Sequence, residues 1–561
     1  IVHNGEFNTI RGNVNWMRAR ENDLEHPAFG AELDTIKPVI DDPNQSDTAS
    51  VDNALELLLQ TDRDLPHALR MLIPEAFRGD DLMADDRADF YDYHASLVEP
   101  WDGPALVIGF DGERVAGVLD RNGLRPCRYE VTTDDRLVVG SEVGALPTEP
   151  ADVRRRGRLQ PGEIFVADPE AGRIVPDDEV FEELTDEKYG EWVEDGQVDL
   201  DALTDEDDVA AGIGADSADD PDGEEVESEE AKPTVRAHQA AFGYTTDSLN
   251  HLVEPMAKDG KDPVGSMGDD TPLSVLADVD RPLFTYFKQL FAQVSNPPID
   301  YIREELVTSL ETRIGNQRNL LDETPEHAEQ IVADTPVLTD AETTALRDLP
   351  GPGERTPGDR DGDDASGGPS FTSVTVDVTY DRDGSLVDAV SRVREDAAAA
   401  IEDGADVVVL SDRAVGPDRL AVPSLLATGA VHHHLVRKGL RNRAGLVVES
   451  GEPHEVHHIA TLVGYGADAV DPYLAYASIA DVVAGPDGAD EDEALAAYRH
   501  ALEDGLLKTM AKMGISTMES YQGAQIFEAV GLDSDFVAEY FEGTEIRTEG
   551  IGVEQIEDDL R

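Results

Sequence analysis

The segment His3-Asn4-Gly5-Glu6 has the residue types that bind an oxyanion. An Asn-Gly pair at the end of an apolar stretch offers a side-chain amide and a backbone N–H to one point. Two converging donors of this kind stabilise the tetrahedral intermediate of acyl transfer. Taken alone, the same pair is also typical of a tight turn. An oxyanion hole does no chemistry without a nucleophile, so this segment first raises the question of what precedes Ile1.

A second candidate is Asp47, within Gln45-Ser46-Asp47-Thr48, where the pattern predicts the start of a helix. In the structural interpretation, Ser46 or Asp47 is the N-cap of this helix. In the functional interpretation, the carboxylate of Asp47 pairs with the α-ammonium group of a substrate.

Asp47 and the first motif, with Glu6, resemble the glutaminase domain of class II glutamine amidotransferases. The resemblance implies that an N-terminal Cys attacks the glutamine side-chain amide, with its own α-amino group as base. It assigns Asn4 and Gly5 to the oxyanion hole, Asp47 to the substrate's amino group, and Glu6 to substrate binding beside it. It also places the nucleophilic Cys and a carboxylate-binding Arg before Ile1. We therefore expect this chain by itself to be catalytically inactive.

Further segments resemble glutamate synthase in particular, in the same order along nearly the whole chain. They are Asn8–Met17, Leu119–Pro126, Arg158–Gly162, Gly265–Leu273, Phe287–Asp300, Ala430–Leu435, Gly464–Val470 and Lys512–Thr517. The resemblance implies an internal fragment of a large subunit that makes two glutamates from glutamine, 2-oxoglutarate and two electrons. Ammonia would pass through an internal tunnel. FMN and a [3Fe-4S] cluster belong to the full-length enzyme, and neither is assigned to this fragment. The implied electron donor is a small NAD(P)H-oxidising subunit or ferredoxin.

Two other hypotheses remain open at the level of sequence. The chain could be a non-catalytic scaffold or regulatory protein that keeps an amidotransferase-like pocket to sense glutamine. Alternatively, it could be another class II amidotransferase, such as a phosphoribosyl- or asparagine-forming enzyme. A chain that begins inside a motif argues against the non-catalytic scaffold. A long central region without a phosphate-binding motif argues against another class II amidotransferase.

The formal net charge of −75 is spread along the whole sequence. Such a distribution favours adaptation to high salt, where self-repulsion is screened, over one acidic patch for a basic partner. It also argues against nucleic acid binding, which needs a basic surface. The apolar runs, such as Ala105–Phe110, are too short to span a membrane. The single Cys127 excludes an internal disulfide and a Cys-rich metal site, and a cytoplasmic location is expected.

No metal site is expected. Neighbouring residues on a helix point about 100° apart, so His432-His433-His434 cannot converge on one ion, and His457-His458 has the same problem. Cys127 lies inside an expected strand, where a lone Cys more often packs than reacts. The loop Gly265–Asp270 has adjacent carboxylates that would repel a phosphate, which favours a structural role.

The expected fold class is multidomain α+β and α/β. It begins with a truncated Ntn-hydrolase-type αββα sandwich and continues with an α/β central domain that has parallel strands. The predicted divisions are an amidotransferase domain at 1–193, an acidic disordered insertion at 194–235, a helical first part of the central domain at 236–345, an acidic Gly/Pro linker at 346–370, the α/β part at 371–500 and a lead-in to the FMN-binding domain at 501–561.

The apolar periodicity predicts the individual elements. The first domain should contain a helix at 46–59 and an antiparallel meander with strands at 105–110, 114–119, 124–131, 137–140 and 164–167. Helical spacing is expected at 283–291 and again at 302–310. After 370, strands at 374–380, 406–410, 446–449 and 468–470 should alternate with helices at 386–401, 424–439 and 454–462, which implies a parallel sheet or part of a barrel. The C-terminal stretch is expected to be mostly helical, without a closing strand.

Overall fold

The computed structural model describes residues 1–42, 45–80, 82–204, 234–263, 272–291, 299–300, 302, 304–353, 370–483 and 490–561. Several expectations concern other residues and lie outside the described ones. They are the acidic run at 216–225, the loop at 265–270, the turn at 296–298 and most of the linker at 346–370.

The N-terminal part is built on a five-stranded sheet with the strand order β1-β2-β3-β7-β8, and all its pairings are antiparallel. Its strands are β1 (Val2–Gly5), β2 (Ala105–Phe110), β3 (Val115–Leu119), β7 (Ile164–Asp168) and β8 (Arg173–Val175). Strands alternate their side chains between two faces, and both faces of this sheet are covered. Val107, Ala116 and Val166 pack against helices, whereas Leu106, Leu119 and Phe165 pack against a second sheet.

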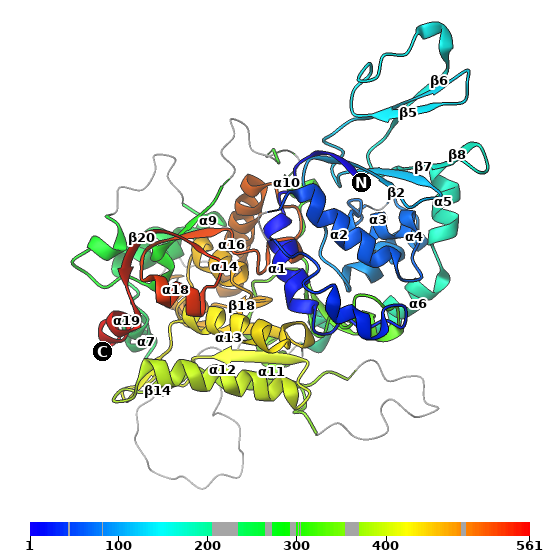
Figure 1. Cartoon of the computed structure of the whole chain (residues 1–561). Helices are drawn as coiled ribbons and strands as arrows, with labels where there is room; N and C mark the ends of the chain where they lie inside the picture. The colour runs from blue at the N-terminus through cyan, green and yellow to red at the C-terminus, as the bar shows by residue number, and fades with distance from the viewer. Residues whose placement is uncertain are drawn as a thin grey trace.

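The helical layer consists of α2 (Asp47–Leu59), α3 (Leu65–Leu72) and α4 (Asp85–Ala95), with α5 (Asp177–Leu184) and α6 (Glu187–Gly196) beside them. The second sheet has the order β5-β4-β6, formed by β4 (Cys127–Thr132), β5 (Leu137–Gly140) and β6 (Val153–Leu159). Its far end projects from the body of the molecule (Figure 1). The predicted strands therefore form, but they divide between two sheets instead of one meander.

Two sequence expectations in the middle of the chain are wrong. Residues 194–204, assigned to the acidic insertion, complete α6 and form β9 (Gln197–Asp199), and Leu200 is buried. The stretch 283–291 is a short 3-10 turn followed by β10 (Phe287–Gln289) instead of a helix. The region also contains β11 (Thr312–Ile314) and β12 (Gln330–Ala333), which form a small sheet with β9. Its helices are short: α7 (Val235–Ala241), α8 (Thr246–Ser248), α9 (Glu254–Asp259), α10 (Glu304–Val307) and α11 (Asp340–Arg347).

The predicted parallel sheet is present, with the order β13-β15-β17-β18 and parallel pairing throughout. Its strands are β13 (Ser373–Asp377), β15 (Val407–Ser411), β17 (Gly445–Glu449) and β18 (Ala469–Asp471). A continuous apolar strand such as β15 is buried on both faces. Val408 and Leu410 face the core that includes α12 (Leu386–Glu402), α13 (Ser424–Lys438) and α14 (Val456–Gly464), whereas Val407 and Val409 face Ile314 and Ile331 of the small sheet.

A two-stranded antiparallel ribbon of β14 (Thr379–Asp381) and β16 (Arg419–Ala421) lies beside this sheet. After β18 the chain continues with α15 (Tyr473–Val483) and the long α16 (Glu491–Met513).

The C-terminal stretch contains two strands, contrary to the expectation of a mostly helical stretch without a closing strand. After α17 (Met518–Tyr521) come β19 (Phe527–Leu532), α18 (Ser534–Tyr540), β20 (Glu545–Ile551) and α19 (Val553–Asp559). Strand β19 pairs with β10 on one side and with β20 on the other. Both misassigned segments therefore belong to one sheet whose partners are far apart in the sequence.

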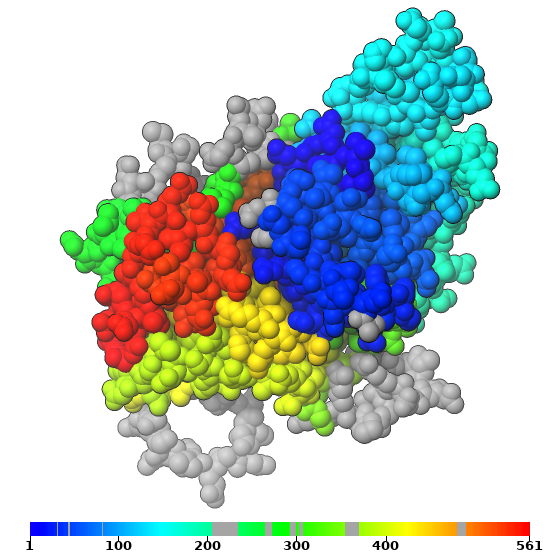
Figure 2. Space-filling model, viewed as in Figure 1, coloured from blue at the N-terminus to red at the C-terminus, as the bar shows by residue number. Residues whose placement is uncertain are grey.

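The two halves of the chain meet along α1 (Ile10–Arg20), as the blue surface beside the yellow and red surfaces shows (Figure 2). Trp16 Nε1 donates to the carbonyl of Gln522 at 2.8 Å, and the amide of Asn15 donates to Gly523 O at 2.9 Å. Just before the helix, Asn8 donates to Gly514 O at 3.1 Å. Among the described residues, no helix is both long and apolar enough to cross a bilayer.

Candidate active site

The motif His3-Asn4-Gly5 forms the edge strand β1 and is not a hairpin turn. Gly5 pairs with Ala105 and has a φ of +143°, a conformation that favours glycine. A Cβ atom at this position would lie 1.8 Å from the carbonyl oxygen of Pro104. The close approach of two backbone segments therefore explains why a glycine ends this strand.

Asp47 begins α2, and the N-cap of that helix is Ser46, whose hydroxyl accepts the N–H of Ala49 at 3.3 Å. Asp47 is consequently not needed as the cap. Its Oδ2 accepts the backbone N–H of Phe7 at 3.0 Å. This bond brings the Asp47 carboxylate to the end of the strand that carries Asn4 and Gly5. The structure thus brings together two of the candidate regions that are far apart in the sequence.

His3 and Thr48 make a second contact between β1 and α2, with His3 Nδ1 3.1 Å from Thr48 Oγ1. The His3 ring stacks on Phe7 at a centroid distance of 4.9 Å, and Phe7 packs edge-on against the buried Trp101. These contacts fix the link between β1 and α1. Burial lowers the pKa of His3, the nearby Asp47 carboxylate raises it, and Arg125 lowers it further. The imidazole is therefore neutral at pH 7.

The two remaining candidates, Asn4 and Glu6, do not contact Asp47 in the hydrogen bonds of the described residues. The amide Nδ2 of Asn4, a half-buried residue, donates to Ser141 Oγ at 2.6 Å, just after β5. Glu6 is exposed, and its backbone N–H donates to Pro104 O at 3.2 Å. The arrangement offers one amide donor and one carboxylate acceptor at the end of a rigid strand. Such a pair can orient a small zwitterionic amide, but it supplies no nucleophile.

Sequence reasoning did not single out His3, Thr48 or Arg125 for this site. His3 and Thr48 are sequence neighbours of the candidate residues Asn4 and Asp47. Their contact would therefore follow from the sequence once β1 is known to pack against α2. Arg125 lies in the segment Leu119–Pro126, which resembles glutamate synthase. Its guanidinium Nε is 3.4 Å from Pro104 O, beside Gly5.

Cys127 is not a hidden nucleophile. It begins β4, is 1% exposed, and packs with Leu106, Leu119 and Leu159 between the two sheets. Burial raises the pKa of its thiol to about 11, so almost no thiolate exists at neutral pH. This agrees with the packing role that the sequence favoured.

The three consecutive histidines on α13 have different partners. His432 Nδ1 accepts from Arg441 Nε at 3.1 Å, and His433 Nε2 is 3.3 Å from Gln525 Nε2. His434 Nε2 lies 3.5 Å from Glu395. A separate cavity of about 480 Å³ lies between α7, the β14–β16 ribbon and α19, and no candidate residue lines it.

Two family profiles match this chain. The profile of class II glutamine amidotransferases matches residues 1–192, and that of the glutamate synthase central domain matches residues 237–533. The first range ends near the predicted boundary at 193. The second begins near 236 and continues beyond 500, where we had expected the central domain to end.

Individual relatives match over the whole length of this chain. It is 41% identical over 563 residues to the large chain of the NADPH glutamate synthase of Bacillus subtilis, covering 100% of this chain and 34% of that protein. It is 41% identical to the NADH glutamate synthase of Schizosaccharomyces pombe, covering 99% of this chain and 26% of that protein. It is 39% identical to ferredoxin-dependent glutamate synthase 2 of Synechocystis, covering 99% of this chain and 35% of that protein. The chain thus spans about a quarter to a third of the length of these relatives.

Proposed function

Because this chain belongs to the glutamate synthase family, with a class II glutamine amidotransferase domain before the central domain, we propose that it forms the glutamine-binding and central parts of a glutamate synthase. The overall reaction converts glutamine, 2-oxoglutarate and two electrons into two glutamates. The matches to whole glutamate synthases do not favour the alternative of a non-catalytic glutamine sensor. They also do not favour another class II amidotransferase.

The observation that carries the proposal is the hydrogen bond between Asp47 and the backbone of Phe7. It holds a carboxylate two residues from Gly5, at the end of the strand that presents Asn4. Oδ1 of Asp47 has no hydrogen-bond partner within the described part of the chain, so it is free to accept from the α-ammonium group of glutamine. The amide of Asn4 and the N–H of Gly5 would donate to the oxyanion as the side-chain amide is attacked.

Asn4 must exchange its present acceptor for the substrate. Its Nδ2 donates to Ser141 Oγ, which in turn donates to Glu142 at 2.5 Å. A carbonyl oxygen that gains negative charge is a stronger acceptor than a neutral hydroxyl. The exchange is therefore favoured in the transition state, which is where a catalytic donor must act. Glu6 completes the proposed set at the exposed rim.

We assign neither cofactor of a glutamate synthase, the iron–sulfur cluster or FMN, to this chain. A [3Fe-4S] cluster needs several Cys thiolates, and the only cysteine here is Cys127, buried between two sheets. The cluster is therefore not ligated by this chain, and we assign FMN, like the cluster, to other parts of a full-length enzyme. The electron donor would be a small NAD(P)H-oxidising subunit or ferredoxin, since relatives named for each donor match similarly.

We also propose that the central part helps to wall the path of ammonia from the glutamine site. The contacts of Asn8, Asn15 and Trp16 hold α1, which directly follows the oxyanion motif, against the segment 514–523. A closed path keeps ammonia from protonation and from loss to solvent.

Asp47→Asn in the full-length glutamate synthase tests the pocket. Loss of the charged acceptor should lower kcat/KM for glutamine about 10- to 100-fold, while synthesis from added ammonium salts stays near the original rate. Asp533→Asn is the matched control, because Asp533, like Asp47, lies at the start of a helix and accepts backbone N–H groups, in its case those of Asp535 and Phe536. An equal loss with glutamine and with ammonium, or no loss with glutamine, would refute the assignment of Asp47.

The isolated chain provides a second test. Without a thiolate at the pocket, release of ammonia from glutamine should not exceed that in buffer, because loss of the nucleophile removes about 10⁶-fold of the rate in a protease precedent. A clear rate above buffer would show that another residue attacks, and the roles proposed above would be wrong.

A further inference from the structure

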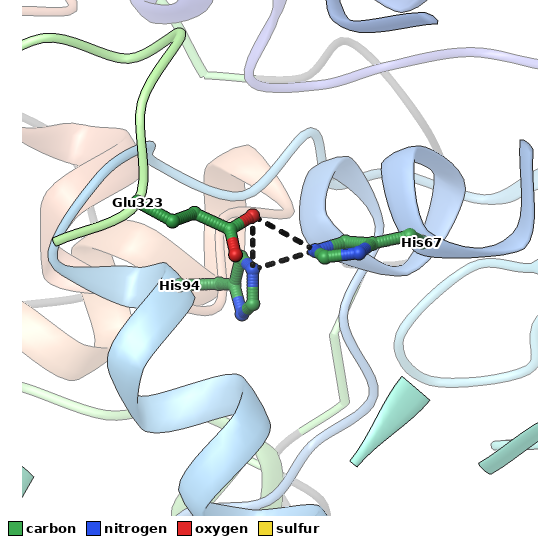
Figure 3. Close-up of side chains that lie close together, drawn as sticks. All are labelled: His67, His94 and Glu323. Carbon is green, nitrogen blue, oxygen red and sulfur yellow. Dashed lines mark hydrogen bonds and ion pairs between the residues drawn. The ribbon is translucent and has the colours of Figure 1, made fainter. Parts of the chain in front are cut away.

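His67, His94 and Glu323 point their side chains toward one another at a junction between the two halves of the chain (Figure 3). His67 belongs to α3 and His94 to α4, both in the amidotransferase range, whereas Glu323 lies in the range of the central domain. His94 is 2% exposed, and the side chains of His67 and Glu323 are 14% and 17% exposed. The cluster has no role in the site proposed for glutamine.

The hydrogen bonds define which nitrogen of His94 faces the cluster as an acceptor. His94 Nδ1 lies 2.6 Å from the carbonyl oxygen of Phe90 and must donate to it. Nε2 of the neutral ring therefore carries the lone pair, and it lies 2.8 Å from Nε2 of His67. Either a proton or a cation must lie between these nitrogens. A histidine whose other N–H donates to a backbone carbonyl is the usual arrangement for a metal ligand.

The three distances match the size of a zinc ion. The two Nε2 atoms are 2.8 Å apart, and Glu323 Oε1 lies 3.4 Å from that of His67 and 3.7 Å from that of His94. The circle through these three atoms has a radius of roughly 1.9 Å, so a point about 2.0–2.1 Å from all three exists just outside their plane. A fourth position then remains for water. Two imidazoles and one carboxylate are a ligand set that zinc accepts.

The neighbouring cations have to be accommodated. Arg63 Nε is 2.8 Å from Glu323 Oε1, and Lys188 Nζ is 3.7 Å from Oε2, which also accepts from Tyr189 OH at 2.9 Å. An oxygen of a carboxylate has two lone pairs, so Oε1 can keep Arg63 and bind an ion. The guanidinium then orients the ligating carboxylate, and its charge lowers the affinity without blocking the position.

We propose that His67, His94 and Glu323 form a zinc-binding site that joins the amidotransferase part to the central part. The metal would link α3 and α4 to the segment before the 3-10 turn Pro325–Ala328. Arg63 and Tyr189 already contact Glu323 in this segment, and Tyr93 of α4 donates to Thr324 O at 3.0 Å. The effect of the metal is structural: it stabilises the folded chain by binding only where all three ligands are assembled.

Metal titration of the isolated chain tests the site. The chain, stripped with a chelator and kept in concentrated KCl to suppress non-specific binding to its many carboxylates, is titrated with ZnCl₂ alone. We expect one tightly bound Zn²⁺ per chain and a rise in the midpoint of thermal unfolding. CoCl₂ in place of zinc should give the visible absorption of a four-coordinate cobalt ion. His67→Gln and Glu323→Gln should each weaken binding at least about 10- to 100-fold.

His251→Gln is the matched control. His251 is exposed on another helix and forms a pair with the exposed Asp247 at 3.7 Å, so its removal deletes a His–carboxylate pair without touching the cluster. Zinc binding should be unchanged in this variant. The proposal is overturned if the original chain binds no zinc, if the cobalt spectrum is six-coordinate, or if a variant that keeps its circular dichroism binds zinc as the original chain does. The cobalt spectrum of the original chain decides the matter even if both variants fail to fold.

Discussion

Gly5 is proposed to bind the oxyanion, and steric constraints also require a glycine at this position. Its Cβ position is occupied by the backbone oxygen of Pro104, and its φ lies in a region that costs other residues free energy. We expect Gly5→Ala to lower the free energy of unfolding by about 2–4 kcal/mol and to detach the edge strand β1. Urea denaturation followed by far-UV circular dichroism measures the change.

Gly79→Ala is a suitable comparison for this substitution. Gly79 also has a positive φ, +74°, but a Cβ there meets nothing within 4 Å. Only conformational strain remains, so the cost should be about 1 kcal/mol. Equal costs for the two variants would show that the contact with Pro104 does not constrain β1.

Asp412, directly after β15, makes the stability of the central part depend on pH. Burial raises its pKa to about 7, although Ser450, Tyr473 and the N–H of Gly451 donate to it and lower the pKa. The folded state therefore holds the proton more tightly than the unfolded state. The contribution of protonated Asp412 to stability is complete below the unfolded pKa of about 4 and is lost as the pH rises through the folded pKa of about 7.

Asp412→Asn should flatten this dependence. Between pH 5 and 7.5 the original chain should lose about 2–4 kcal/mol of stability that the variant does not lose, as followed by urea denaturation at each pH. Asp403→Asn, at an exposed position after α12, should leave the slope unchanged. If Asp412→Asn and the original chain had parallel profiles, Asp412 would not titrate in this range.

At the scale of elements, α1 is the helix that connects the candidate site to the rest of the molecule. Trp16 is 3% exposed, donates to Gln522 O, and lies under the guanidinium of Arg441 at 5.1 Å. Trp16→Phe removes this donor and leaves the Gln522 carbonyl without it. We expect a loss of about 1–2 kcal/mol in the free energy of unfolding, measured by urea denaturation.

Trp192→Phe is the control, because Trp192 is half-buried and packs by its ring against Tyr93. Its cost should stay within about 0.5 kcal/mol. If Trp16→Phe cost no more than this control, the hydrogen bond between α1 and the segment 514–523 would not contribute to the junction.

The elements also differ in how well the sequence predicts them. The strands at 105–110 and 137–140 have the predicted bounds, and the helices of the α/β part deviate by one or two residues. Local periodicity sufficed there, because each element buries a face of its own. At 283–291 the apolar residues have helical spacing, but β10 pairs with β19, some 240 residues later. Non-local pairing overrode the local pattern.

At the scale of the whole molecule, the formal charge of −75 must repel itself at low ionic strength. The Debye length falls from about 10 Å at 0.1 M salt to about 3 Å at 1 M, so salt screens the repulsion between separate carboxylates. We expect the midpoint of thermal unfolding to rise by at least about 5 °C between 0.1 M and 2 M KCl. NaCl should act like KCl, and a midpoint that is unchanged or falls would contradict the interpretation as adaptation to salt.

The sequence by itself determined the family, through motifs in order along the chain, and the elements of the parallel sheet, through periodicity that each segment carries alone. It also marked Asn4, Gly5 and Asp47 as candidates. Only the tertiary structure decided that Asp47 binds the backbone of Phe7, that Cys127 is enclosed between two sheets, and that His67 and His94 meet Glu323. The physical reason is that a contact between distant segments depends on how whole layers pack, and no local propensity encodes that packing.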